Sequence, residues 1–225
     1  MPEIHIPKSG HVAFRKLIDL TAPEFDALLD AVAHTPPAAS PDLFWKHVAE
    51  KVSNIPPKTV ENIVDELFSL NYARENWSLS VEEFAKTLAD AAVSQSPKKT
   101  PITTDEKNTL LIRVTRLLEL KASLTITSKA LDVLTDAERL FFTAKILTDV
   151  RPVFDEDGKN VEGAVIMHNL RIHYGQDNEH RDFFVALDTS DIKELRSVLD
   201  RADKKAESLQ ALLGRAKVSY LKIEE

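Results

Sequence analysis

Hydrophobic residues recur every three or four positions along the first two-thirds of the chain, which is the pattern of amphipathic helices. One such helix begins at Thr21, which stands three positions before Glu24 as in a reciprocal capping box. Ser40 followed by Pro41 predicts the start of a second helix, because proline is favoured at the first helical position. The apolar face of the first helix, and of a third one further along, consists of Phe25, Leu28, Leu29, Val32, Val60, Ile63, Val64 and Leu67.

Three further capping boxes continue this helical pattern. They are Ser80 with Glu83 before "FAKTLADAAV", Thr103 with Glu106 before "NTLLIRVTRLLELKA", and Thr135 with Glu138 before "RLFFTAKI". The second of these segments is so rich in apolar residues that we expect a buried, central helix. The polar stretch "SQSPKKTPITT", residues 94–104, is broken by two prolines and indicates a linker inside the helical region.

Near residue 145 the period of the hydrophobic pattern changes from about 3.6 to 2, which indicates strands. The segment "KILTDVRPVF" predicts a strand that ends near Pro152, because proline has no N–H to donate within a sheet. The segments "GAVIMHNLRIHY" and "RDFFVAL" predict two more strands, and their short connections make the sheet antiparallel. A long helix follows from Asp191 to about Lys217, capped by Thr189 or Ser190 and closed near Gly214.

These elements predict an α+β protein: a helical N-terminal region, a three-stranded antiparallel sheet and a long C-terminal helix. We expect an all-helical domain over residues 1–144, with the possible internal linker at 94–104, and a βββα domain over 145–225.

Composition removes several classes of function. The chain has no cysteine, so disulfides, thiolate nucleophiles and cysteine-ligated metals are excluded. Its five glycines form none of the glycine-rich loops that cradle phosphates, so we expect no cofactor. The net charge of −7 argues against a general polyanion binder. The first residues lack the apolar run of a secretory signal, and no stretch is apolar enough to cross a membrane, so we expect a cytoplasmic protein without a membrane partner.

The segment "MHNLRIHYGQDNEH" contains three of the seven histidines and raises the question of a metal site. His168 and His173 are five positions apart, so they point to opposite faces of one regular strand and cannot share a metal. His180 stands in or just after the following turn, and a zinc ion would still need a third ligand. We therefore predict no metal site.

Two other polar stretches have the composition of possible binding sites. "FDEDGKNVE", residues 154–162, lacks the spacing of a calcium loop and indicates a hairpin turn with solvated acids. The stretch 98–129 is basic and could contact phosphates, but no aromatic residue interleaves with its charges. Its cations are Lys98, Lys99, Lys107, Arg113, Arg116, Lys121 and Lys129. No combination of residues identifies catalytic groups, so we predict no catalytic residue and a protein that is not an enzyme.

The last helix contains the strongest signal for an interface. Its apolar positions alternate spacings of three and four, which is the a/d seam of a coiled coil: Ile192, Leu195, Leu199, Ala202, Ala206, Leu209, Leu213 and Ala216. At about 39 Å this helix would be longer than strands of seven or eight residues, which span about 26 Å. Both faces of the sheet are partly apolar, and the helix can cover only one. Either the N-terminal helices or a second subunit would cover the other face.

The segments "AVIMHNLRIHY" and "RDFFVALDTSDIKELRSVLDRA" resemble the last two strands and the closing helix of COMM-domain proteins. The order of parts, an all-helical region followed by three antiparallel strands and a helix, is also similar. This resemblance implies a non-enzymatic module that dimerises through its sheet-and-helix unit and scaffolds other proteins. It implies no catalytic residues.

We therefore predict a protein–protein interaction or scaffolding protein that self-associates through its C-terminal unit, with itself as the expected partner. The candidate interface or core residues, two roles that the sequence does not separate, are Met167, Phe184, Ile192, Leu195, Leu199, Ala202, Ala206 and Leu209. Two alternatives remain open at this stage: a small nucleic-acid-associated regulator that uses residues 98–129, and an enzyme of unrecognised type.

Overall fold

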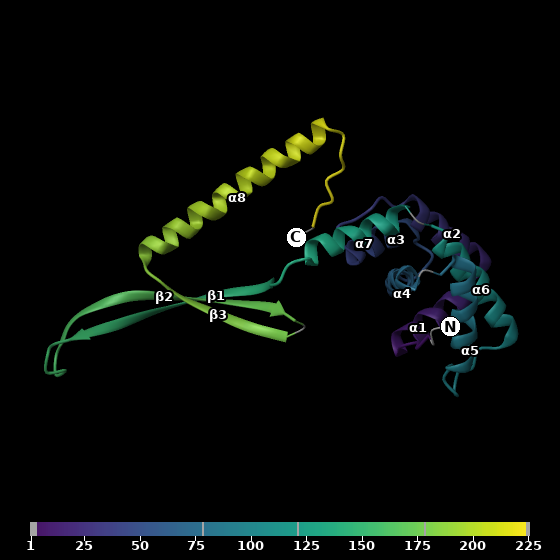
Figure 1. Ribbon diagram of the computed structural model, residues 1–225, viewed down its shortest axis with the longest axis horizontal. Coiled ribbons are helices and arrows are strands. Elements are labelled where there is room, and N and C mark those ends of the chain that lie inside the picture. Colours follow the sequence, from purple (N-terminus) through teal and green to yellow (C-terminus); the bar gives the residue numbers. More distant parts are fainter. Residues whose placement is uncertain (1–3, 78, 121, 178, 224–225) are drawn as a thin grey trace. The chain divides into compact units, whose positions relative to one another are not determined.

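The computed structural model describes residues 4–77, 79–120, 122–177 and 179–223, which form an α+β fold as predicted (Figure 1). The chain divides into two compact units. The helical unit comprises residues 1–134 together with 221–225, and the sheet unit comprises residues 135–220. In the described residues the helical unit contains α1 (Lys8–Asp19), α2 (Ala22–His34), α3 (Pro41–Lys51), α4 (Pro57–Asn76), α5 (Val81–Ser94), α6 (Thr104–Leu118) and α7 (Ala122–Thr135). The sheet unit contains β1 (Leu140–Phe154), β2 (Val161–Gln176), β3 (Glu179–Leu187) and α8 (Thr189–Arg215).

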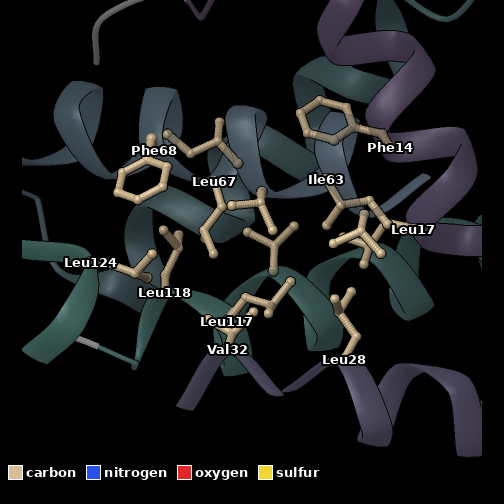
Figure 2. Packing of buried hydrophobic residues seen from close by; sticks show 14 of the residues in the cluster. Phe14, Leu17, Leu28, Val32, Ile63, Leu67, Phe68, Leu117, Leu118 and Leu124 are labelled. Atoms are coloured by element: carbon tan, nitrogen blue, oxygen red, sulfur yellow. The ribbon is translucent and has the colours of Figure 1, made fainter. Parts of the chain in front are cut away.

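Four helices of the helical unit, α2, α3, α5 and α6, start where the sequence signals them. Full capping boxes are formed by Thr21 with Glu24, Ser80 with Glu83 and Thr103 with Glu106, and Ser40 caps α3. The predicted apolar positions then pack into one continuous core, in which α1, α2, α4, α6 and α7 all take part (Figure 2). Labelled there are Phe14, Leu17, Leu28, Val32, Ile63, Leu67, Phe68, Leu117, Leu118 and Leu124. The helical unit therefore buries most of its large apolar side chains within itself.

Two parts of the helical unit differ from the prediction. The helix expected to be central and buried, α6, is buried on one face only, and Ile112 on another face is exposed. It ends at its C-cap, Glu119, and a separate helix, α7, follows; neither α7 nor α1 was predicted. Arginines at 113 and 116 divide the apolar run of α6 and make it amphipathic. The expected linker at 94–104 is the connection between α5 and α6.

The helix predicted after Thr135 is wrong, because residues 140–154 form the single strand β1. Aromatic and β-branched side chains in this segment favour a strand, and pairing with β2 overrides the local capping signal. The strands are antiparallel in the order β1-β2-β3, so β1 is an edge strand. An edge strand tolerates proline, and β1 therefore continues past Pro152 to Phe154.

The strand register defines two faces of the sheet. Alternate residues point to opposite sides and paired residues share a side, so each cross-strand pair belongs to one face. The apolar face contains Phe141, Ala144, Ile146 and Val150 of β1, Ala164, Ile166, Leu170 and Ile172 of β2, and Phe183, Val185 and Leu187 of β3. The mixed face contains Lys145, Leu147, Asp149 and Arg151 of β1, Met167, Asn169, Arg171 and His173 of β2, and His180, Asp182, Phe184 and Ala186 of β3.

The C-terminal helix exists as predicted, with two corrections. Its cap is Asp188, whose carboxylate accepts hydrogen bonds from the N–H groups of Ser190 and Asp191 at 2.6 and 2.9 Å. Its 27 residues span about 40 Å, while the 15 and 16 residues of β1 and β2 span about 50 Å. The prediction that the helix is longer than the sheet is therefore wrong, because the two strands extend well beyond their predicted ends.

The three capping boxes predict an acid-sensitive helical unit. Hydrogen bonds from Thr21, Ser80 and Thr103 lower the pKa values of Glu24, Glu83 and Glu106 from the ordinary value of 4.5. Groups whose pKa is lower in the folded state stabilise it fully above the ordinary pKa, and this contribution is lost as the pH falls through the lower, folded value.

We expect the unfolding midpoint of the helical unit in denaturant to fall as the pH is lowered below about 4.5, with the fluorescence of Trp45 and Trp77 as the probe. The triple variant Glu24→Gln, Glu83→Gln, Glu106→Gln keeps amide groups that can cap but do not titrate. Its midpoint should change less over the same pH range. An equal change in both proteins would contradict a role for the capping boxes in acid sensitivity.

Candidate functional site

The side chains of the sheet unit are almost all accessible to solvent. Leu187 is the only buried residue among the described residues of 135–220, and α8 contains no buried residue. A three-stranded sheet normally has one apolar face packed against a helix or another sheet. Within the sheet unit both faces are largely exposed, although the strand pairing is complete. The sheet unit therefore presents surfaces that would ordinarily be interior.

The apolar face is the largest of these surfaces. Large side chains from all three strands stand on it, and Val150, Ile166 and Phe183 are 66%, 57% and 53% exposed. Few charged groups interrupt them, because the alternation of the strands directs most charges to the other face. Large contiguous apolar patches of this kind are typical of protein–protein interfaces.

The seam of α8 is a second uncovered apolar surface. Leu199 is 65% exposed and Leu209 is also exposed, while Ile192 in the first turn is half-buried. The remaining seam residues of α8 lie on the same side of the helix at spacings of three and four. The seam and the apolar face are thus two apolar surfaces of one unit, and neither is buried within that unit.

The structure distributes the eight predicted interface residues over two surfaces. Ile192, Leu195, Leu199, Ala202, Ala206 and Leu209 all lie on α8 and form its seam. Met167 and Phe184 lie instead on the mixed face, where Met167 is paired with Asp149 and Phe184 with Arg171. The apolar face, with Ile146, Val150, Ile166 and Phe183, was not selected from the sequence. The alternation in residues 164–174 could have indicated it, but the pairing partners in β1 depend on the register.

The three clustered histidines take different positions in the sheet. His168 is on the apolar face and its Nδ1 lies 2.8 Å from the hydroxyl of Thr148. His173 and His180 are both on the mixed face, where their rings stack with centroids 5.4 Å apart and Phe142 beside them. This stack was not predicted, because His180 is opposite Gly175 only through the register of β2 and β3.

One of the two stacked histidines, His173, contacts an ion pair between Asp182 and Arg171. Both carboxylate oxygens of Asp182 accept hydrogen bonds from Arg171, at 2.9 and 2.8 Å, and one of them lies 3.0 Å from Nδ1 of His173. These contacts lower the pKa of Asp182 and raise that of Arg171. The carboxylate is therefore engaged by two side chains. Among the described residues no three histidine, aspartate or glutamate side chains lie close enough to hold a metal ion.

The other polar stretches mainly serve the fold. Asp155 in the loop between β1 and β2 accepts hydrogen bonds from the side-chain amide of Asn160 at 2.7 Å and from the backbone N–H groups of Lys159 and Asn160 at 2.8 and 3.2 Å, and these lower its pKa. The carboxylate therefore closes the hairpin turn.

In the basic stretch, Lys107 pairs with Asp90 and Arg116 with Asp26, while Arg113 donates hydrogen bonds to three backbone carbonyls. Lys121 lies outside the described residues. Three of the seven cations thus have partners within the chain, which leaves less of this stretch available for phosphates.

Within the described residues, no helix is both long enough and apolar enough to cross a membrane. Comparison with known proteins adds no assignment: no protein-family model matches this chain, and no curated protein matches it either.

Proposed function

We propose that this protein is a non-enzymatic interaction or scaffolding protein that self-associates through its sheet unit. The observation that carries this proposal is the exposure of the apolar face together with the seam of α8. Each large apolar side chain that is half-exposed gains about 1 kcal/mol when it is covered, so leaving both surfaces in water is costly. A partner that covers them would remove this cost.

A second copy of the chain is the partner that fits these surfaces best. A symmetric dimer pairs a surface with its own equivalent or exchanges two complementary surfaces, and the sheet unit has both an apolar face and an apolar helix. The charged residues of α8 are of both signs, so two copies of the helix do not repel each other strongly. In such a dimer the seam of one α8 would cover the apolar face of the partner's sheet.

The two alternatives from the sequence are less well supported by the described residues. A nucleic-acid role for residues 98–129 is weakened because Lys107, Arg113 and Arg116 have partners within the chain. An enzyme would need a pocket with catalytic groups, and the polar cluster of the mixed face is an exposed ion pair beside two histidines. The resemblance to COMM-domain proteins agrees with the proposal and stays a prediction.

The molar mass of the full chain in solution tests the proposal directly. We expect light scattering on a sizing column to give twice the chain mass of 25.2 kDa, with dissociation only on dilution. A mass of one chain at all concentrations would contradict self-association. In that case the surfaces would be covered within one chain, by α8 or by the helical unit.

A further inference from the structure

A groove of about 520 Å³ on the helical unit has no role in the proposed self-association. One of its walls is a single face of α1, and the other is the connection between α5 and α6. Its lining residues are Lys8, His11, Val12, Arg15 and Lys16 from α1, and Pro97, Thr100 and Ile102 from the connection. The spacing of the α1 residues places them on one side of the helix, so the groove runs along it.

The floor of this groove is mostly apolar. Val12 is exposed although the rest of the apolar side of α1 is buried, and Pro97 and Ile102 face it from the connection. Burial, together with nearby His5, lowers the pKa of His11, so this ring is mainly neutral at pH 7 and adds surface rather than charge. An exposed valine and a proline that line the same groove can contact an apolar side chain of a ligand.

The rim of the groove is positively charged. Lys98 and Lys99 occupy the turn between Pro97 and Thr100, which is closed by a 2.9 Å hydrogen bond from the N–H of Thr100 to the carbonyl of Pro97. Together with Lys8 they are exposed and form no ion pair within the described part of the chain.

Lys16 and the start of α1 also contribute positive charge to the rim of the groove. The ammonium of Lys16 contacts a backbone carbonyl and the amide of Asn62, so no carboxylate neutralises it. Arg15 forms an ion pair with Glu106 and therefore adds no net charge to the rim. The first turn of α1 contains no acidic residue and its N-cap has no side-chain hydrogen bond, so the positive end of the helix dipole adds to the rim.

We propose that this groove binds an acidic peptide segment of a partner protein, with an apolar side chain over Val12 and Pro97 and carboxylates near Lys8, Lys98 and Lys99. The choice of ligand rests on charge complementarity in a chain whose net charge is −7. Lys8 and Lys16 line the groove without a neutralising carboxylate, and Lys98 and Lys99 stand between the lining residues Pro97 and Thr100. Nucleic acid fits less well, since single strands are usually held by stacking aromatics, and no phenylalanine, tyrosine or tryptophan lines the groove. The site is in the helical unit, so it is independent of self-association through the sheet unit.

The test uses the full chain and a short fluorescent peptide in which glutamates alternate with leucines. We expect saturable binding by fluorescence anisotropy that weakens when salt is raised from about 50 mM to about 300 mM, because the rim charges are exposed. The triple variant Lys8→Glu, Lys98→Glu, Lys99→Glu should bind about ten-fold more weakly. The ammonium groups of these lysines form no hydrogen bond or ion pair among the described residues, so the variant is expected to fold normally.

A matched control changes the same total charge elsewhere on the helical unit. Lys46→Glu, Lys86→Glu, Lys129→Glu replaces three exposed lysines outside the groove and should bind the peptide almost as tightly as the natural chain. Amide resonances of residues 8–16, 98–100 and 102 should also shift on peptide addition. The proposal is overturned if the peptide does not bind, if both triple variants lose binding equally, or if duplex DNA binds at these residues and the peptide does not.

Discussion

Replacing Ile166 with glutamate is expected to convert the proposed dimer into a monomer that is still folded. Ile166 stands on the apolar face, where it is paired with Val150 of β1 and is 57% exposed. A carboxylate at this position would be buried in the proposed interface without a partner, which costs several kcal/mol per chain. The sheet itself should tolerate the change, because the isolated chain leaves this side chain in solvent. Light scattering on a sizing column gives the mass directly.

Ile112 provides a matched control for this experiment. It is also an isoleucine and is 59% exposed, but it lies on α6 in the helical unit. Ile112→Glu introduces the same charge at nearly the same exposure, so it should leave the mass unchanged. If both variants, or neither, become monomers, the apolar face is not the interface.

A third variant separates the two surfaces of the sheet unit. Leu199→Glu places a charge in the seam of α8, where the natural side chain is 65% exposed. If the seam covers a partner's sheet, this change should weaken association as Ile166→Glu does. Loss of the dimer with Leu199→Glu alone would indicate a helix–helix interface and would contradict the part assigned to the sheet.

Several helix starts in the helical unit can be predicted from local signals in the sequence. Thr21, Ser80 and Thr103 start helices because each is followed three residues later by a glutamate that completes the hydrogen bonding of the first turn. The same spacing at Thr135 and Glu138 starts no helix, since Thr135 ends α7 and the next segment pairs with β2. A capping signal thus predicts a helix only where the following residues do not pair with a neighbouring strand.

The proposed interaction surface could be predicted only in part. The seam of α8 depends on spacing within one helix, so its residues could be identified from the sequence. The faces of the sheet depend on register, which is a property of two strands at once. Met167 and Phe184 were chosen as large apolar residues, yet pairing with Asp149 and Arg171 places them among charges. The groove beside α1 could not be predicted, because it joins residues that are about 85 positions apart.

The two units differ in how far they bury their apolar residues. In the helical unit Phe14, Phe44 and Phe84 are fully buried, and the buried hydroxyls of Thr35 and Thr127 are hydrogen-bonded within the unit. In the sheet unit the comparable aromatic residues Phe141 and Phe183 are exposed. This contrast is the physical basis for assigning self-association to the sheet unit. It also predicts that changes inside the helical unit affect stability rather than assembly.

Replacing Arg113 with alanine should be the most destabilising single change that we predict in the helical unit. Its Nη1 group donates hydrogen bonds to the carbonyls of Leu17, Ile18 and Leu20, at 2.6, 3.1 and 2.8 Å. These carbonyls belong to the last turn of α1 and its C-cap, where helical partners are missing. Hydrogen bonds from a charged donor contribute more than neutral ones, so we expect a loss of about 2 to 3 kcal/mol in the free energy of unfolding.

Arg116 is the control for this prediction, because it lies one turn further along α6 and also stacks on Phe25. The two guanidinium carbons are 5.0 and 5.1 Å from the centre of that ring, so both alanine variants lose a similar cation–π contact. Arg116 differs in that its ion pair with Asp26 is exposed, and we expect Arg116→Ala to cost less than about 1 kcal/mol. Urea unfolding followed by tryptophan fluorescence measures both variants, since Trp45 and Trp77 belong to the helical unit. Equal losses would mean that the stacking on Phe25, rather than the carbonyl contacts of Arg113, anchors α6 to the end of α1.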